Sequence, residues 1–192
     1  MFAFRVAKHV KSNAIVYVLS GKRVFHKNSK AYELNEGACA FIKKGAHISE
    51  MEPEAGWCVM TFFIPDNFLK NLIMENEKSL PLGDLSEDEG DHVILLAVNE
   101  LSKSFFNSML PYFTQFPSPP ENLLELKFKE LILSLLSQNQ NKPLLAYLNN
   151  LRNDKHPSME EVVQNNYTFN LTLEEFAKLA CKSVPTFKRE FK

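Results

Sequence analysis

The stretch that decides the fold is "AIVYVLSGKRVFH", residues 14–26. "AIVYVL" is a short run of apolar residues, mostly β-branched or aromatic, which is typical of a buried strand. "SGK" follows as a turn signal, and "RVFH" predicts a second strand. The chain therefore begins with a β-rich region and not with helices.

Further strands are predicted on the C-terminal side of this stretch. "AYEL", "ACAFI" and "WCVMTFFIP" alternate with the turn signals "KNSK", "NEG" and "KKGAH", and Pro65 closes the last strand. Short strands with turns roughly every eight to twelve residues predict a small antiparallel sandwich or barrel over residues 1–65. With 16 Phe in the chain, we expect side chains to fill its interior and any cavity to be small and apolar.

The period of the apolar residues changes after Pro65. "DNFLKNLIMENE" predicts a helix with Asp66 as its N-cap. "HVILLAVNELSKSFFNS" predicts a second helix, because its apolar residues share one helical face: Val93, Leu96, Ala97, Leu101 and Phe105. We assign residues 66–155 to a helical linker and dimerisation region.

The most apolar helix of this region is "ENLLELKFKELILSLLSQ", residues 121–138. Its apolar residues cover more than one face, so the helix has to be buried on two sides. One side can pack on the strand domain, and the other meets a second copy of the chain or lies wholly inside one chain. The stripe that we expect at or beside a homodimer interface consists of Leu124, Phe128, Leu131 and Leu135.

Composition limits the class of protein. The 192 residues carry a formal net charge of −1 and are 45% hydrophobic, so a core can form and any DNA-binding charge has to be local. Three cysteines without a CxxC pair fit a reduced, intracellular protein. The sequence shows no signal peptide and no membrane span, and we expect a cytoplasmic address without membrane contact.

The chain ends with "LTLEEFAKLACKSVPTFKREFK", residues 171–192, which predicts two short helices joined by a tight turn. Thr172 with Glu175 forms a capping-box pattern, as Ser158 with Glu161 does before the preceding helix. Ser183 starts the last helix, whose predicted inward face is Val184, Phe187 and Phe191.

The outward face of that last helix is basic. It carries Pro185, Thr186, Lys188, Arg189 and Lys192, and four Lys or Arg with one Glu give residues 182–192 a local charge of +3. In a helix-turn-helix, the second helix enters the major groove, where long cationic side chains reach phosphates and guanine edges. The alternative is an ordinary helical hairpin with a solvated basic face.

The same residues resemble the first helix-turn-helix of AraC-type bacterial transcription regulators. The matching positions are Leu173, Ala177, Ala180, Cys181, Ser183, Phe187, Arg189, Phe191 and Lys192. The chain departs from the pattern at Cys181, where Gly is common because the turn favours a positive φ, and at Lys182, which is normally apolar.

This resemblance implies a DNA-binding unit over residues 156–192, truncated before its second helix-turn-helix. It places base contacts on Pro185, Lys188 and Arg189, with Thr186 as a neighbour. It also implies a cupin-like antiparallel β-barrel before the linker helices, and Gly37, Gly45 and His47 are similar to the family's strand–Gly–strand–Gly–His run. The predicted fold class is therefore α+β, and the layout resembles the branch that activates type III secretion, which implies control by a partner protein or small effector.

The rival interpretation is a cupin-type enzyme or small-molecule binder whose helical tail only packs. Metal cupins need a cluster of His and Glu, but only His26 and His47 lie in the barrel region, and no H-x-H is present. Neither a phosphate loop nor a nucleophile elbow occurs. We therefore expect no catalytic residues, no metal and no cofactor, and we treat these two histidines as turn or edge residues.

Overall fold

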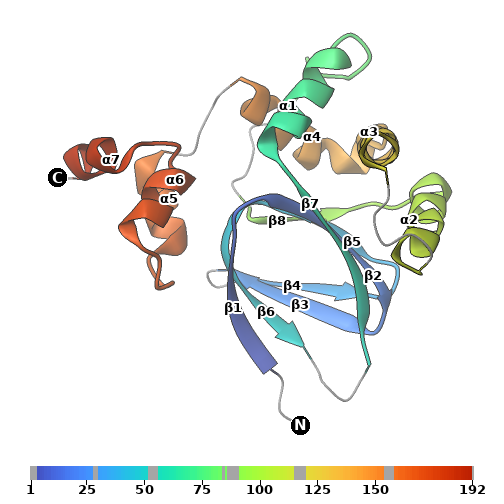
Figure 1. Ribbon diagram of the computed structural model, residues 1–192, viewed down its shortest axis with the longest axis horizontal. Helices are drawn as coiled ribbons and strands as arrows, with labels where there is room; N and C mark the ends of the chain where they lie inside the picture. Colours follow the sequence, from blue (N-terminus) through green and yellow to red (C-terminus); the bar gives the residue numbers. More distant parts are fainter. Residues whose placement is uncertain are drawn as a thin grey trace.

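The computed structural model describes residues 4–27, 30–51, 56–83, 85, 91–114, 120–153 and 158–191. The fold is α+β as predicted, with strands first and helices after them (Figure 1). The strands are β1 (Phe4–Val10), β2 (Asn13–Ser20), β3 (Lys22–Lys27), β4 (Lys30–Asn35), β5 (Cys39–Ile42), β6 (Gly45–Met51), β7 (Cys58–Ile64) and β8 (Val93–Leu96). The helices are α1 (Asp66–Glu75), α2 (Glu100–Thr114), α3 (Glu121–Leu136), the short 3-10 helix η2 (Asn139–Asn141), α4 (Lys142–Arg152), α5 (Met159–Asn166), α6 (Leu173–Leu179) and α7 (Val184–Glu190).

The strands form two antiparallel four-stranded sheets, in the orders β1-β6-β3-β4 and β7-β2-β5-β8. Strand β2 is buried on both faces. Ile15 and Tyr17 pack with the helices, whereas Ala14, Val16 and Val18 pack with Phe25 and Leu34 of the other sheet. The two sheets form an open barrel, because no ladder among the described strands joins them into a closed one.

Strand β8 corrects the helix predicted from Val93. Val93–Leu96 pairs with β5 in antiparallel register, from Ile42 opposite Val93 to Cys39 opposite Leu96. A short apolar run is compatible with either period, and tertiary pairing decides which one forms. Helix α2 begins only at Glu100, where the Asn99 side chain accepts a hydrogen bond of 3.0 Å from the Ser102 amide. The sheet therefore includes a strand from beyond residue 65.

Two further expectations are corrected, one for Asp66 at the start of α1 and one for His47 in the barrel. Asp66 does not cap α1; its carboxylate binds Asn13 Nδ2 at 2.8 Å and Lys44 Nζ at 2.7 Å. The interior is not wholly apolar, because buried polar side chains project from β3 and β6: Arg23, Lys27, His47 and Ser49. His47 is therefore an interior residue and not a turn or edge residue.

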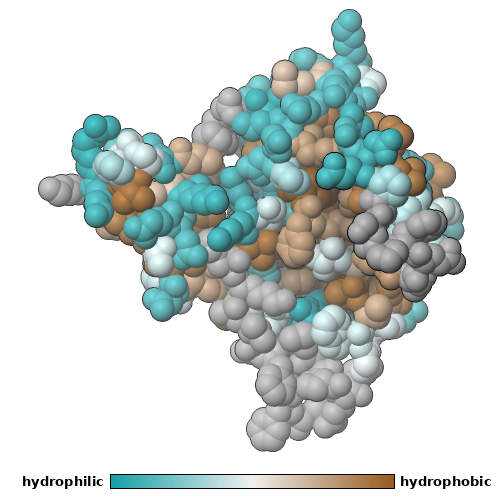
Figure 2. All heavy atoms as spheres, in the orientation of Figure 1, coloured by the Kyte–Doolittle hydropathy of each residue, from teal (hydrophilic) through white to brown (hydrophobic). Residues whose placement is uncertain are grey.

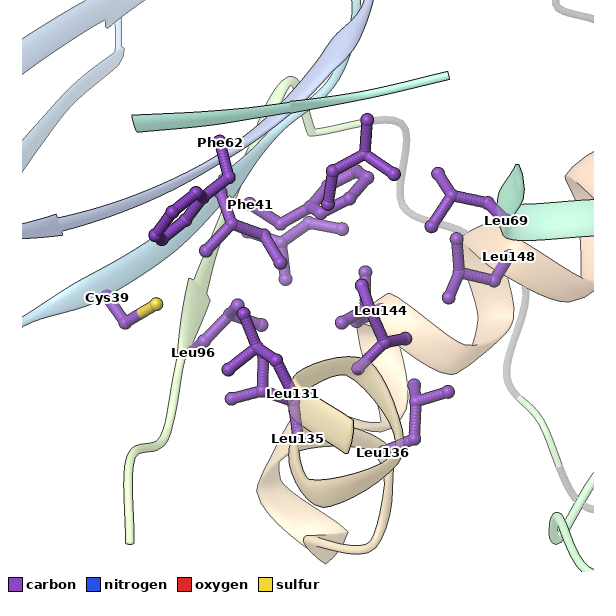
Figure 3. Packing of buried hydrophobic residues seen from close by; sticks show 14 of the residues in the cluster. Cys39, Phe41, Phe62, Leu69, Leu96, Leu131, Leu135, Leu136, Leu144 and Leu148 are labelled. Atoms are coloured by element: carbon purple, nitrogen blue, oxygen red, sulfur yellow. The ribbon is translucent and has the colours of Figure 1, made fainter. Parts of the chain in front are cut away.

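The main core lies between the β7-β2-β5-β8 sheet and helices α1 to α4. Tyr17 of β2 stacks on Phe106 of α2, with ring centroids 3.9 Å apart and planes within 4°. Leu131 and Leu135 of α3 point into this core, beside Leu96 and Leu144 (Figure 3). They are 0% exposed within one chain, so they offer no surface to a second copy. Any dimer contact of α3 has to come from its other residues.

A separate small core belongs to α5, α6 and α7. It contains Val162, Ala177, Leu179, Ala180 and Phe187. These three helices form a lobe to one side of the sheets, and α7 lies at its outer end (Figure 1). None of the described helices has the length and apolar character that a membrane span needs.

Candidate nucleic-acid interface

Capping boxes fix the start of both α5 and α6. Ser158 Oγ accepts from the Glu161 amide at 3.1 Å, and Glu161 Oε2 accepts from the Ser158 amide at 2.7 Å. Thr172 and Glu175 repeat the arrangement at 3.2 Å and 2.8 Å. Each box satisfies two amides that a helix start leaves unpaired, and both are where the sequence predicted them.

The turn between α6 and α7 depends on Cys181, whose φ is +53°. After it, the Lys182 amide donates to the Ala177 carbonyl at 2.8 Å, which is the closing bond of a Schellman-type helix end. A left-handed residue is easiest for Gly, and this is the physical reason why Gly is common at this position. The turn has the conformation that the helix-turn-helix pattern requires, although the residue at the left-handed position is Cys and not Gly.

Helix α7 is anchored by one aromatic side chain. The Ser183 hydroxyl caps the helix by accepting from the Thr186 amide at 3.3 Å. Phe187 is 2% exposed and stacks on Phe176 of α6 with centroids 6.3 Å apart. Phe191 was predicted to face inward, but it is 57% exposed and contacts Phe187 from outside, because it lies one residue beyond the helix end.

The predicted DNA-contacting residues gather on the free side of α7. Pro185, Lys188 and Arg189 are exposed and Thr186 is half-buried, with its hydroxyl 2.8 Å from Ser183 Oγ. Within the part of the chain that the structure describes, Lys188 and Arg189 form no hydrogen bond or ion pair. Lys192 lies outside the described residues.

One cation of this region is already neutralised. Lys182 Nζ lies 2.7 Å from Glu190 Oε2, which closes a bridge from the turn to the end of α7. The local charge of +3 that sequence counting gives therefore rests on Lys188, Arg189 and Lys192, of which the last lies outside the described residues. Hydrophilic residues cover most of the lobe in the view of Figure 2, with a small hydrophobic patch between them.

The barrel brings together two histidines that the sequence did not connect. His92 Nε2 lies 3.4 Å from His47 Nδ1, because His92 directly precedes β8. The pKa of His92 lies well below its usual value, first because the ring is buried and then because Lys27, His47 and Lys43 are nearby. Among the described residues, no group of three or more His, Cys, Asp or Glu could hold a metal ion.

A large part of the chain matches a known protein family. Residues 13–147 match the profile of the ExsA N-terminal regulatory domain. The matched segment runs from β2 into the first half of α4, so it covers strands β2 to β8 and helices α1 to α3 and leaves out β1. It is more than half of the chain.

Two proteins of Yersinia are similar to almost the whole chain. The virulence regulon transcriptional activator VirF of Yersinia enterocolitica is 24% identical over 191 residues, which is 98% of this chain and 69% of that protein. The thermoregulatory protein LcrF of Yersinia pestis matches with the same identity and coverage.

Solved structures agree on the fold. ToxT of Vibrio cholerae superposes with a TM-score of 0.51 at 13% identity, covering 98% of this chain and 73% of that one. The AraC-like transcriptional activator CuxR superposes with a TM-score of 0.50 at 11% identity, covering 98% and 72%. The fold agrees with the AraC-type resemblance of the sequence, and the family match shows that the chain belongs to the ExsA N-terminal regulatory domain family.

Proposed function

We propose that the protein binds specific DNA sequences through α6 and α7, with Lys188 and Arg189 as the contacting cations and Pro185 and Thr186 beside them. The observation that carries this proposal is the free side of α7. Its two cations are exposed and unpaired within the described residues, while Phe187 holds the opposite side in a core. An exposed helix of this kind, on the second position of a helix-turn-helix, is the element that enters the major groove.

The proposal is tested with the full-length protein on its operator. Lys188→Ala and Arg189→Ala each remove one cation without touching the core. Losing a base contact should cost about 1–3 kcal/mol of discrimination, and losing a phosphate contact should weaken all sequences alike. Lys78→Ala is the matched control, because it removes an exposed lysine far along the chain from α7. A variant that carries both substitutions should bind the operator weakly in a gel-shift titration. Normal binding would contradict the assignment of Lys188 and Arg189 as DNA-contacting residues.

We further propose that the protein acts as a homodimer through the exposed sides of α2 and α3. Large apolar side chains remain exposed there: Leu101, Leu110 and Phe113 on α2, with Leu123 and Leu126 on α3. Leu124 and Phe128 of the predicted stripe are half-buried beside the core and can contribute their edges. Hydrophobic residues reach the surface near these helices at the right of Figure 2. Exposed apolar surface of this kind is a mark of protein contact.

The regulatory role is assigned to residues 13–147, since the family profile that matches them describes a regulatory domain. In this proposal a partner protein or small effector acts on the open barrel and α1 to α4, and the lobe of α5 to α7 responds. The protein is a regulator and not an enzyme, and a protein that reads promoter DNA works in the bacterial cytoplasm. A metal titration tests the rival interpretation as a cupin-type enzyme. That interpretation requires the protein to bind a metal ion tightly and in stoichiometric amount.

A further inference from the structure

The lobe of α5 to α7 is attached to the barrel through a buried polar contact. Lys27, the last residue of β3, donates from Nζ to the Asn166 Oδ1 atom at 2.9 Å and to the Ala46 carbonyl of β6. Asn166 is the last residue of α5, and 139 residues separate it from Lys27. Their exposed fractions are 5% for Lys27 and 6% for Asn166.

Both ends of the Asn166 amide are used. Its Oδ1 also accepts from the Ala46 amide at 3.3 Å, and its Nδ2 donates to the Val162 carbonyl of α5 at 2.7 Å. These bonds fix which way the amide points, because oxygen has to face the two donors and nitrogen the carbonyl. The side chain therefore links the α5 backbone to the backbone and side chains of the barrel.

Two neighbours shape the contact. Phe169 lies over the Lys27 ammonium, with 4.9 Å between Nζ and the ring centroid. Gly45 has a φ of +130°, and a Cβ there would lie 3.3 Å from His92 Cε1 and 3.6 Å from Asn166 Oδ1. The positive φ and the short distance to His92 favour glycine at this position, and the distance to Asn166 is an ordinary van der Waals contact.

The loss of hydration of the buried Lys27 ammonium opposes this contact. Burial lowers the pKa of Lys27 to about 8, and no carboxylate is among the causes of the shift. A buried ammonium held by an amide oxygen, a carbonyl and an aromatic face regains water when the lobe leaves. The contact is specific in geometry, but opening it has a compensating gain in hydration. Such a contact can be shifted by modest changes at the barrel.

We propose that Lys27, Ala46 and Asn166 form a clasp that holds the helix-turn-helix lobe in a fixed orientation on the barrel, so that changes in the barrel are transmitted to DNA binding through Asn166. The clasp does not cover α7, which lies at the far end of the lobe (Figure 1). It therefore acts by positioning and not by blocking the DNA-contacting side. The DNA part of this inference rests on the proposed function, whereas the docking part does not.

The docking part is tested on the DNA-free chain by NMR relaxation of backbone amides. In the wild type, residues 158–191 should tumble together with the sheets. Asn166→Leu removes the acceptor of Lys27 and should release the lobe, giving its amides shorter rotational correlation times. Gln164→Leu changes an exposed α5 residue away from the clasp and should tumble as the wild type does.

Lys27→Ala releases the lobe from the barrel side and leaves the α5 sequence intact, which covers the case that Asn166→Leu unfolds the lobe. Joint tumbling in a folded Asn166→Leu or Lys27→Ala chain would overturn the clasp. In the full-length protein, release should weaken operator binding by at least about fivefold, the lower end of couplings between protein sites. Unchanged operator affinity in a released variant would overturn the positioning role. Failure of the wild type to bind any DNA would instead overturn the proposed function and leave the docking result standing.

Discussion

Lys182 and Glu190 form an ion pair across the start and end of α7, with Nζ and Oε2 2.7 Å apart. The pair neutralises one cation of the lobe that is proposed to bind DNA. Both side chains are partly exposed, with 31% and 39% of their surface accessible, so the bond contributes little to stability. In the proposed DNA complex, its larger effect is on the number of phosphates that the lobe contacts.

The ion pair gives a prediction about charge. Glu190→Gln in the full-length protein frees Lys182, so non-specific DNA affinity should increase and the salt slope of binding should steepen by about one phosphate contact. Fluorescence anisotropy titrations over a range of salt concentrations measure both. Lys182→Ala in the wild-type background serves as the control, because removing an already neutralised cation should change the slope little. A large decrease in the salt slope with Lys182→Ala would show that this lysine already contacts DNA.

The turn at Cys181 gives a prediction about stability. A residue with a side chain at φ of +53° is strained relative to glycine. Cys181→Gly should therefore stabilise the lobe, and Cys181→Val should destabilise it, each by about 1 kcal/mol. Hydrogen exchange of the α6 and α7 amides reports on the lobe alone. Equal protection in the two variants would mean that the turn relaxes to another conformation.

Helix α3 gives a prediction that separates core from interface. Leu131→Ala should destabilise the fold by about 2–5 kcal/mol, because the Leu131 side chain is 0% exposed and its loss leaves a cavity between large side chains. Leu126 is 65% exposed, so Leu126→Glu should leave stability nearly unchanged and weaken the dimer. Urea unfolding measures the first effect and sedimentation the second. A wild type that sediments as a monomer at micromolar concentration would refute the dimer proposal.

Lys27 gives a prediction about pH. Because burial lowers its pKa to about 8, from an ordinary value of 10.5, the folded chain binds fewer protons at this site than the unfolded chain between these values. The free energy of unfolding should therefore rise with pH from about 8 to about 10.5, by at most about 3 kcal/mol from this group. Lys27→Met should remove that rise.

The measurement is urea unfolding of both proteins at pH 8 and pH 10, with their difference taken at each pH. Other titratable groups of the neighbourhood are present in both proteins and cancel in the difference: His47, His92, Lys43, Lys30 and Asp91. An equal pH dependence in the two proteins would mean that Lys27 is hydrated in solution and that the clasp is open.

The sequence alone determined the elements whose signals are local. The strand runs around "AIVYVLSGKRVFH" and the pairs Ser158–Glu161 and Thr172–Glu175 depend on residues close in the chain, and the structure confirms them. The basic side of α7 also followed from spacing, because three and four residues bring side chains to one helical face. These features needed no knowledge of what packs against them.

Only the tertiary structure decided the features that depend on distant partners. Val93–Leu96 is a strand because β5 offers a free edge, and its own apolar run fits a helix equally well. Leu131 and Leu135 point into the core because the β7-β2-β5-β8 sheet lies against α3, which periodicity cannot show. The contact of Lys27 with Asn166 joins residues far apart in sequence, and neither has a local signal that names the other. The physical reason is common to all three: burial and pairing are properties of the folded chain, whereas period and capping are properties of a segment.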